Sequence, residues 1–320
     1  MDIETKDLTI SVSKPPKRIV DCANIRVDEG EFVGLLGPNG SGKSTILKTV
    51  YRTMKRESGE IYLDGKILDE LSLRDTANMM SVVTQHNYYN FEFKVEEVVL
   101  MGRTPHKKMM ELDNDEDHQI VEDALKKVNM WEMRDRGFSS LSGGEQQRII
   151  LARALAQQTP CMILDEPTNH LDIKYQLEVL DIVKGLHCTT LCALHDLNLA
   201  AMYCDRIYII CNGKIVREGT PEEVITEEMI AEIYGTKATV ERHPKTGLIN
   251  IVYHPGVNRN RSSNPAGRPA GTLFENWKDG AVAPWFILRS PWASRMRRRR
   301  RLPCTACTRR PWRRPPRARA

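Results

Sequence analysis

The stretch "GPNGSGKST", residues 37–45, decides the fold. It fits the spacing G-x-x-x-x-G-K-[ST], with Gly37, Gly42, Lys43 and Ser44 in the required places. An apolar run precedes it and predicts a buried strand, and residues 44–52 predict a helix. Strand, glycine loop and helix form the setting of a phosphate cradle, because backbone N–H groups and a helix N-terminus attract anions. The alternative interpretation is an ordinary turn between a strand and a helix.

The cradle interpretation assigns a role to each part of the loop. Lys43 is expected to reach the β- and γ-phosphates of a nucleotide, and the Ser44 hydroxyl to bind Mg²⁺. The predicted phosphate-binding residues are Gly37, Pro38, Asn39, Gly40, Ser41, Gly42, Lys43, Ser44 and Thr45.

Length and composition bound the class of protein. The 320 residues suffice for one large core or two modest ones, and 41% of them are hydrophobic. No apolar run approaches the roughly 20 residues that cross a bilayer. The N-terminal "MDIETKDLTI" lacks the apolar centre of a signal peptide, so we expect a cytoplasmic protein.

The net charge of +5 hides a division along the chain. Residues 259–320 hold 17 Lys and Arg against 2 Asp and Glu, a balance of +15, so the rest of the chain is acidic. This Arg- and Pro-rich composition builds no packed core and predicts a disordered basic tail. The tail is either a functional extension or the product of a frameshift.

Cysteine usage points to a reducing compartment. Six of the eight cysteines are scattered through residues 22–211, mostly within apolar runs, and are expected to be buried free thiols. The pair Cys304 and Cys307 has C-x-x-C spacing without a second half-site, which does not predict a zinc site.

Strand and helix patterns alternate through most of residues 1–258, which predicts an α/β domain with a largely parallel sheet. Residues 86–150 break this alternation with helical patterns alone and predict a helical insert. Residues 206–219 predict a hairpin that turns at Asn212 and Gly213. We expect this to be the last hairpin, complete by Gly219.

Two acidic residues directly follow the apolar strand "CMIL". Asp165 suits a water-mediated hold on the Mg²⁺ that Ser44 binds. Glu166 is then placed to polarise an attacking water. A bare Asp-Glu pair is weak support alone, but it follows the predicted phosphate loop by about 120 residues.

The stretch "LSGGEQQR", residues 141–148, predicts a second anion site. A turn of small residues opens a helix and presents backbone donors at its N-terminus. Ser142 and Glu145 also fit a plain capping box, and both interpretations can hold for the same residues. One chain needs one γ-phosphate cradle, so a second one suggests an ATP shared between two subunits.

These motifs occur in a fixed order: residues 37–45, the Gln85 turn, "LSGGEQQR", "CMILDEP", "NHLD" and "LHDLN" with His195. Together they resemble the ATPase subunit of an ABC transporter over residues 3–255. The run "LMGRTPH" and the stretch from "ALHDLN" to "HP" at 254–255 are similar to the subgroup that serves importers of iron–siderophore complexes, haem and cobalamin.

The resemblance implies a P-loop NTPase core with a mostly parallel sheet, an antiparallel β subdomain and an inserted helical subdomain. It also implies catalytic roles for Gln85, Glu166 and His195: Gln85 would sense the γ-phosphate and join Ser44 and Asp165 at the metal, and His195 would contact the γ-phosphate and orient water. Asp172 would contact the other subunit. The ATP of the partner subunit would bind the signature residues Leu141, Ser142, Gly143, Gly144 and Glu145.

The implied cofactors are ATP and Mg²⁺, and the implied partners are a second ATPase subunit, integral membrane permease subunits and, indirectly, a substrate-binding protein. Such a subunit is peripheral, on the cytoplasmic face of the membrane. The chain departs from the family near the end of its first strand, where "LTISVSKPP" offers Val12 and no aromatic residue for adenine. We therefore assign no adenine-stacking residue.

A second function remains open at this point. The same ATPase, acting away from the membrane, could work on nucleic acid or ribosomes through its arginine-rich tail. The single ATPase module, the absence of a long coiled coil and the importer-like residues 100–106 favour import.

Overall fold

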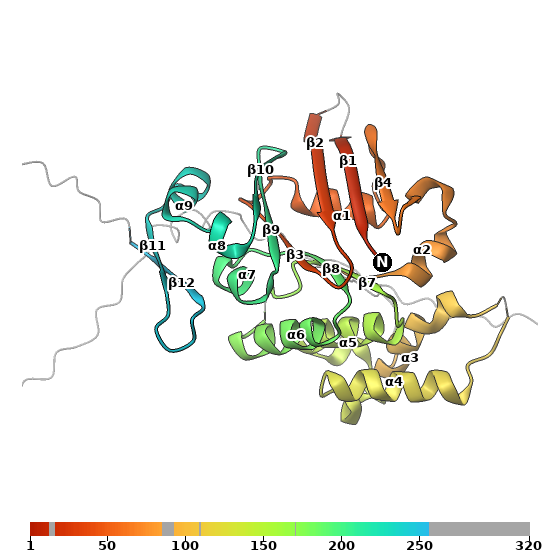
Figure 1. The fold of residues 1–320 in the computed structure, drawn as a ribbon. Coiled ribbons are helices and arrows are strands. Elements are labelled where there is room, and N and C mark those ends of the chain that lie inside the picture. Colours follow the sequence, from red (N-terminus) through yellow and green to blue (C-terminus); the bar gives the residue numbers. More distant parts are fainter. Residues whose placement is uncertain (13–16, 85–92, 109, 170, 256–320) are drawn as a thin grey trace, which may run out of the picture. The chain divides into compact units, whose positions relative to one another are not determined.

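The computed structural model describes residues 1–12, 17–84, 93–108, 110–169 and 171–255 (Figure 1). They lie within one compact unit, Met1–Arg259, and within these ranges form three sheets with helices around them. Gln85, which sequence analysis placed at the active site, lies outside the described residues, as does the tail from residue 256.

A six-stranded sheet in the order β10-β9-β3-β8-β7-β6 carries the functional residues. Its strands are β3 (Phe32–Leu36), β6 (Met80–Val83), β7 (Cys161–Asp165), β8 (Thr189–Ala193), β9 (Arg206–Cys211) and β10 (Lys214–Gly219). All neighbours pair in parallel except β9 and β10, which form the predicted hairpin. The turn lies at Asn212 and Gly213, both with positive φ, as that pair of residues predicts. The largely parallel sheet expected from sequence is confirmed.

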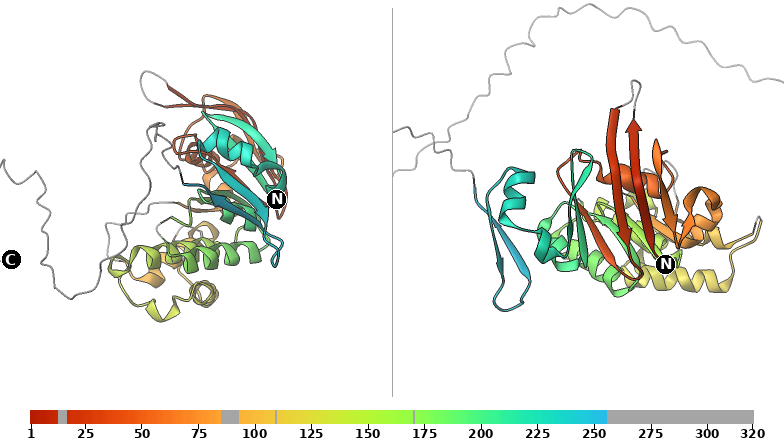
Figure 2. Two further views of the ribbon diagram at one scale, coloured as in Figure 1. Left: turned by 90° about the vertical axis from the view of Figure 1, so that its left-hand side faces the viewer. Right: turned by 45° about the horizontal axis from the view of Figure 1, so that its top comes forward.

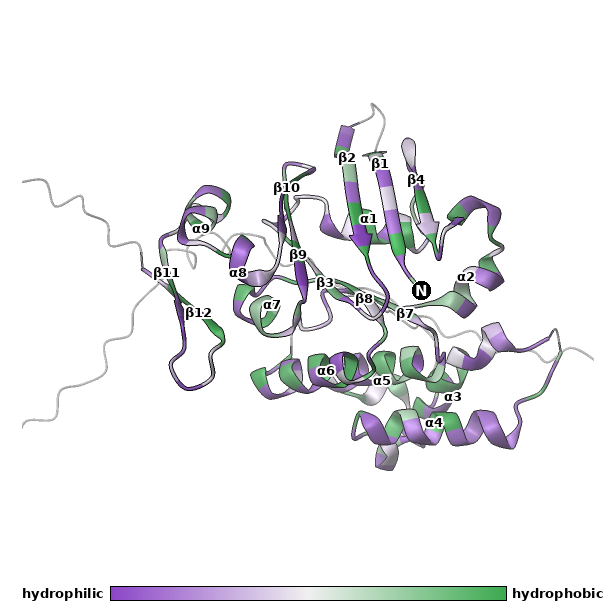
Figure 3. Cartoon of the chain, viewed as in Figure 1, coloured by the Kyte–Doolittle hydropathy of each residue, from purple (hydrophilic) through white to green (hydrophobic). Residues whose placement is uncertain are grey.

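This sheet is buried on both faces, which explains why its strands read as continuous apolar runs. In β3, Phe32 and Leu36 belong to one hydrophobic core, and Val33 and Leu35 to the other. Helices α5 (Gly143–Ala156) and α6 (Ile173–Gly185) pack into the first core, and hydrophobic and hydrophilic residues are interspersed along them (Figure 3). Helix α1 (Lys43–Val50) packs into the second. The helices that follow the two predicted anion sites therefore lie on opposite faces of the sheet.

The second core also holds an antiparallel sheet in the order β2-β1-β4-β5. Its strands are β1 (Ile3–Val12), β2 (Lys17–Val27), β4 (Ser58–Leu63) and β5 (Lys66–Ile67). The central strand β1 pairs with both neighbours, with Ile3 opposite Val27 on one side and Leu63 on the other. The predicted antiparallel β subdomain is thus present, and Figure 1 shows it standing over α1.

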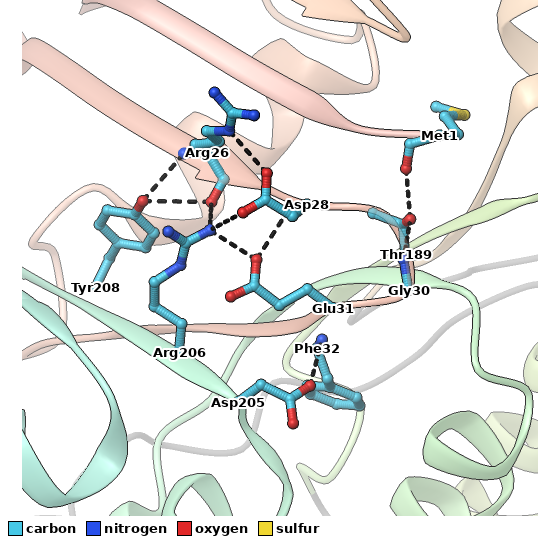
Figure 4. A network of polar contacts seen from close by, with 10 residues as sticks. All are labelled: Met1, Arg26, Asp28, Gly30, Glu31, Phe32, Thr189, Asp205, Arg206 and Tyr208. Carbon is cyan, nitrogen blue, oxygen red and sulfur yellow. Dashed lines mark hydrogen bonds and ion pairs between the residues drawn. The ribbon is translucent and has the colours of Figure 1, made fainter.

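Polar contacts centred on Arg206 join the two sheets (Figure 4). Its guanidinium donates to the backbone oxygen of Arg26 at 2.9 Å and to the carboxylate of Glu31 at 2.6 Å. On β8, at the other side of β3, the Thr189 hydroxyl donates to the backbone oxygen of Met1 at 2.5 Å. The antiparallel sheet is therefore fixed in place beside the strand that leads into the phosphate loop.

Helices α3 (Val95–Leu100), α4 (Asp115–Lys127) and α5 lie on the other side of the parallel sheet, as Figure 1 and the left view of Figure 2 agree. The apolar face of α4 packs inward, with Val121, Ala124 and Leu125 buried. A buried ion-pair network holds the start of this helix: Arg103 contacts Asp117 at 3.0 Å, and Lys107 contacts the same carboxylate at 2.5 Å.

The prediction that the last hairpin ends at Gly219 is wrong, because further elements follow it. They are α8 (Pro221–Val224), α9 (Glu227–Tyr234), β11 (Ala238–Arg242) and β12 (Ile249–Tyr253). Helices α2 (Leu73–Met79) and α7 (Leu197–Tyr203) precede Gly219. Strands β11 and β12 form a second antiparallel hairpin. Six residues separate them rather than a two-residue turn, so the usual hairpin signal is absent from the sequence.

The cysteines of the described part, Cys22 to Cys211, are all free. Cys161, Cys192 and Cys204 are buried, as expected, whereas Cys22 is exposed. Burial raises the pKa of the three buried thiols, which keeps them protonated and unreactive.

Candidate active site

The loop of residues 37–45 joins β3 to α1 and opens into a pocket of about 300 Å³. Residues 39–45 line this pocket together with Val12, Ile19 and Glu166. The loop needs its glycines: Gly37 has φ +147, and a Cβ there would lie 2.0 Å from the backbone oxygen of Ile210. Gly42 caps α1 in the left-handed region, with φ 113. The sequence therefore forms the strand–loop–helix cradle that its spacing predicts.

Lys43 is held inside this cradle. Its side chain donates from Nζ to the backbone oxygens of Gly37 at 2.8 Å and Pro38 at 3.2 Å, and the residue is only 4% exposed. Burial lowers the pKa of the Lys43 ammonium, against the opposing effect of the nearby Glu166 and Asp165 carboxylates. A desolvated cation that neutral carbonyls hold is ready to exchange them for phosphate oxygens.

The Ser41 hydroxyl adds a second indication of a ligand. This oxygen is buried and has no hydrogen-bond partner within the described ranges. An unsatisfied buried hydroxyl costs free energy, so such groups usually serve a ligand or water. Its place in the loop, two residues before Lys43, fits a phosphate oxygen as that partner.

Ser44 and Asp165 meet across the carboxyl ends of β3 and β7. Burial raises the pKa of the Asp165 carboxyl, and a hydrogen bond with the Ser44 hydroxyl opposes that rise. Asp165 is 3% exposed, and its Oδ1 has no hydrogen-bond partner among the described residues. A hydroxyl and a buried carboxylate oxygen are ligands that Mg²⁺ prefers. These residues therefore fit the predicted metal, directly through Ser44 or through water from Asp165.

Glu166 follows Asp165 and lies against His195 at the end of β8. The His195 Nε2 atom makes a close contact with Glu166 Oε1. The Glu166 backbone N–H donates to the oxygen of Ala193 at 3.2 Å, so β7 and β8 together fix both side chains. Because Glu166 also lines the loop pocket, the structure brings the predicted base and the predicted histidine to the same side of the cradle.

Asn169 is a polar neighbour of Glu166 that sequence analysis did not select. Its Nδ2 donates to Glu166 Oε2 at 2.6 Å. Sequence analysis named the motif "NHLD" that begins with Asn169 but selected only Asp172 from it, because an asparagine in a loop has many explanations.

The signature residues begin α5, where Ser142 and Glu145 form the capping box that the sequence predicts. The Ser142 hydroxyl accepts from the Glu145 backbone at 3.4 Å, and the Glu145 carboxylate accepts from the Ser142 backbone at 2.8 Å. Gly143 and Gly144 follow in the first turn, and a Cβ on Gly144 would lie 3.3 Å from Leu171. Since α5 packs into a different core from α1, this helix start is not part of the chain's own cradle.

Asp172 occupies the N-cap position of α6, and its side chain makes no capping hydrogen bond. The residue is exposed, which leaves it accessible to another protein surface. At one side of the pocket, Val12 is joined by Ile19, which the sequence did not single out. Both are aliphatic, so the departure from an aromatic residue noted in the sequence is also found in the structure.

Two absences complete the description of residues 1–255, apart from the short gaps given above. Within those ranges no three His, Cys, Asp or Glu side chains cluster so as to hold a metal by themselves. Among the helices described there, none combines the length and the apolar character that a membrane span requires.

A phosphate loop between a parallel strand and a helix, with an Asp-Glu pair at the end of β7, two strands away in the same sheet, defines a P-loop ATPase. Comparison with known proteins then specifies the family. The family model for the ABC transporter matches residues 20–169. The petrobactin import ATP-binding protein FpuC of Bacillus anthracis is 41% identical over 221 residues, 68% of this chain and 81% of its own length.

Other relatives agree. The iron(3+)-hydroxamate import ATP-binding protein FhuC of Bacillus subtilis is 38% identical over 71% of this chain and 86% of its own length. The ferric enterobactin transport ATP-binding protein FepC of Escherichia coli is 34% identical over 73% and 88%. The chain therefore belongs to the ABC transporter ATPases, and within them it groups with the ATP-binding proteins of importers.

Solved structures support the fold. A putative metal-chelate type ABC transporter in an inward-facing conformation aligns with a TM-score of 0.68 over 79% of this chain and 98% of its own, at 23% identity. The dimeric ATP-binding cassette MJ0796, bound to ADP and Pi, aligns with a TM-score of 0.63 over 68% and 98%, at 27% identity. The predicted fold class is confirmed, and the chain is a nucleotide-using ATPase.

Proposed function

We propose that this ATPase powers the uptake of an iron–siderophore, haem or cobalamin-type compound through separate membrane permease subunits. The names of its relatives support this cargo class: they include importers of petrobactin and hydroxamate siderophores, hemin and cobalamin. The subunit would act as a peripheral protein on the cytoplasmic face of the membrane. The comparisons give no support to the alternative of a nucleic-acid or ribosome-associated ATPase.

One observation carries the mechanism: Lys43 and Glu166 line a single pocket at the carboxyl ends of three neighbouring strands. Asp165 lies near Lys43, and His195 lies against Glu166. Lys43 would exchange its loop carbonyls for the β- and γ-phosphates of ATP. Ser44 and Asp165 would hold Mg²⁺, which when bound supplies positive charge beside the reacting phosphate. Glu166 would accept a proton from the attacking water, and His195 would orient that water against the γ-phosphate.

We propose that two copies of the chain share their ATP. The Ser142–Glu145 turn begins α5, and the Lys43 cradle leads into α1. These two helices lie on opposite faces of one sheet, so a single chain cannot place both segments on one nucleotide. A second subunit in head-to-tail orientation resolves this. The signature residues 141–145 would then bind the partner's γ-phosphate, and the exposed Asp172 would contact the partner. Gln85 keeps its proposed role in sensing the γ-phosphate and contacting the permease.

The proposed ATPase domain comprises residues 1–258, with a helical subdomain at about 86–150. Residues 259–320 would be dispensable for hydrolysis, because the proposed site residues all precede residue 200. The adenine base would lie against Val12 and Ile19, which offer apolar contact without an aromatic face.

The substitution Glu166→Gln tests the catalytic assignment, because it retains size and hydrogen bonding but removes basicity. We expect this variant to bind ATP, to hydrolyse it very slowly and to accumulate as an ATP-dependent dimer. Single-turnover cleavage and light scattering measure the two properties. Glu116→Gln, an exposed substitution on α4, is the matched control and should behave as wild type. Near-normal cleavage by Glu166→Gln would assign water activation to another residue.

The cargo is tested with the whole transporter. The ATPase is co-expressed with a candidate permease, reconstituted in vesicles and supplied with a ferric siderophore, haem or cobalamin on its binding protein. We expect one of these to stimulate ATP hydrolysis. Co-purification with RNA in place of membrane subunits would contradict the import proposal.

A further inference from the structure

Asn169 donates two hydrogen bonds to Glu166, one from its side chain and one from its backbone. Its side-chain Nδ2 donates to Glu166 Oε2 at 2.6 Å, and its backbone N–H donates to the Glu166 backbone oxygen at 3.3 Å. The amide is therefore tied to the carboxylate and to the peptide that carries it. With the His195 ring against Oε1, each oxygen of the Glu166 carboxylate has a different neighbour.

The Glu166 backbone needs such support. Its φ of 55 lies in the left-handed region, which a glutamate rarely adopts. Residues in sparsely populated conformations persist where their surroundings fix them, and they concentrate at functional sites. Here the fixing contacts are the bond to the Ala193 oxygen on one side and those from Asn169 on the other.

The segment that carries Asn169 is itself anchored. The backbone oxygen of Thr168 accepts from the Gln176 side chain at 3.2 Å and from the Leu171 N–H at 3.4 Å. Leu171 packs into the hydrophobic core. Asn169 is consequently presented to Glu166 by a loop that α6 and the core hold in place, rather than by a freely moving chain.

We propose that Asn169 is a positioning residue for ATP hydrolysis, whose amide holds Glu166 Oε2 and thereby turns the carboxylate toward the phosphate pocket. The proposal rests on the proposed role of Glu166 as the base. It requires a hydrogen-bond donor at position 169, since an ionised carboxylate oxygen only accepts hydrogen bonds. An aspartate there has nearly the same shape but presents a second negative charge to Glu166.

Two variants test this with steady-state ATP hydrolysis as a function of pH. Asn169→Ala removes the hydrogen-bond donor, and Asn169→Asp replaces it with a hydrogen-bond acceptor. We expect kcat to fall about 10- to 100-fold in both, the range for residues that orient a catalytic group, with KM nearly unchanged. In Asn169→Asp the shape of the kcat profile should also differ from that of wild type, because the substitution adds a second carboxyl group beside Glu166.

Asn24→Asp is the matched control. Asn24 donates to the Asp7 carboxylate at 3.3 Å on an exposed strand, so its substitution creates the same kind of carboxylate pair away from the pocket. It should leave kcat, KM and the pH profile as in wild type. If Asn169→Asp does not fold, Asn169→Ala decides the question alone through its kcat.

A double-mutant comparison separates this inference from the proposed function. In the Glu166→Gln background, Asn169→Ala should cause little further loss of single-turnover cleavage, because the group that it positions is already disabled. A full additional loss would mean that Asn169 acts elsewhere and would overturn the inference. Wild-type kcat and pH profile in both Asn169 variants would do the same, even with Glu166→Gln inactive. Normal cleavage by Glu166→Gln would instead remove the proposed base.

Discussion

Replacing Lys43 with alanine removes the one cation that the loop itself directs into the phosphate pocket. In the free protein this ammonium is buried and hydrogen-bonded to two loop carbonyls. Its desolvation is therefore already part of the cost of folding, and ATP does not have to supply it. What Lys43 contributes to binding is the difference between its attraction to phosphate and the two carbonyl bonds that it gives up.

That difference can be worked out. Two unit charges about 4 Å apart in surroundings of effective dielectric about 20 attract by about 4 kcal/mol. The ammonium would face two phosphates, the β and the γ, which doubles this attraction to about 8 kcal/mol. Each carbonyl bond that the charged ammonium gives up is worth about 3 kcal/mol. The net contribution is then about 2 kcal/mol, so Lys43→Ala should weaken Mg-ATP binding by about 30-fold and abolish hydrolysis, because the γ-phosphate is no longer held against Glu166.

Equilibrium titration with Mg-ATP measures the dissociation constant directly, and a melting curve of the free variant checks that it folds. Lys66→Ala, on the exposed strand β5, is the control and should bind as wild type. A dissociation constant for Lys43→Ala within twofold of wild type would refute the reasoning, since it would mean that the ammonium stays on its carbonyls when ATP binds.

Three further predictions concern the pH dependence of stability, the shared site and the tail. Although burial alone would raise it, bonds from Lys107, Arg103 and the Asn114 backbone lower the pKa of Asp117 to about 2. This carboxylate therefore contributes stability above about pH 4 that is lost as pH falls toward 2, and Asp117→Asn should lower the melting temperature at pH 7 but much less at pH 2. Ser142→Arg and Lys43→Ala homodimers should both be inactive, whereas their mixed dimer has one intact site and should close on ATP in light scattering. Wild-type hydrolysis by a strict monomer would contradict the shared site. Deleting residues 259–320 should leave ATPase rate and melting temperature unchanged but abolish heparin retention, and lost activity would move the domain boundary.

The sequence predicted the parts of the fold that depend on neighbouring residues. Helix α7 spans Leu197–Tyr203 as expected, and the Asn212-Gly213 turn joins β9 to β10, because such elements follow from local apolar spacing and from residues that tolerate positive φ. The strand–loop–helix arrangement of the phosphate loop could be predicted for the same reason. Glycine is required where a Cβ atom would collide with the neighbouring backbone, as at Gly37 beside the Ile210 oxygen. The motif has glycine at such positions.

Contacts between distant segments could not be predicted in the same way. The hairpin β11–β12 lacks a tight turn, and its strands contain too few alternating residues to signal a sheet. Lys43 and the loop carbonyls are close in sequence, yet the spacing of the motif does not specify that the Lys43 ammonium donates to the Gly37 oxygen. Asn169 became a candidate only once the carboxylate that it binds had a position.

The capping box at Ser142 shows why a structural and a functional interpretation of one motif need not compete. Ser142 and Glu145 satisfy two backbone donors of α5 between themselves, which stabilises the helix start. Gly143 and Gly144 carry no side chain that would screen the remaining donors, so the same turn leaves N–H groups facing outward for an anion. Gly144 also lies against Leu171, in the loop that presents Asn169 to Glu166. A partner's phosphate bound at the helix start would thus lie near the segment that carries Asn169. Because each subunit would donate one such contact and receive another, closing the dimer on ATP would complete both catalytic sites together.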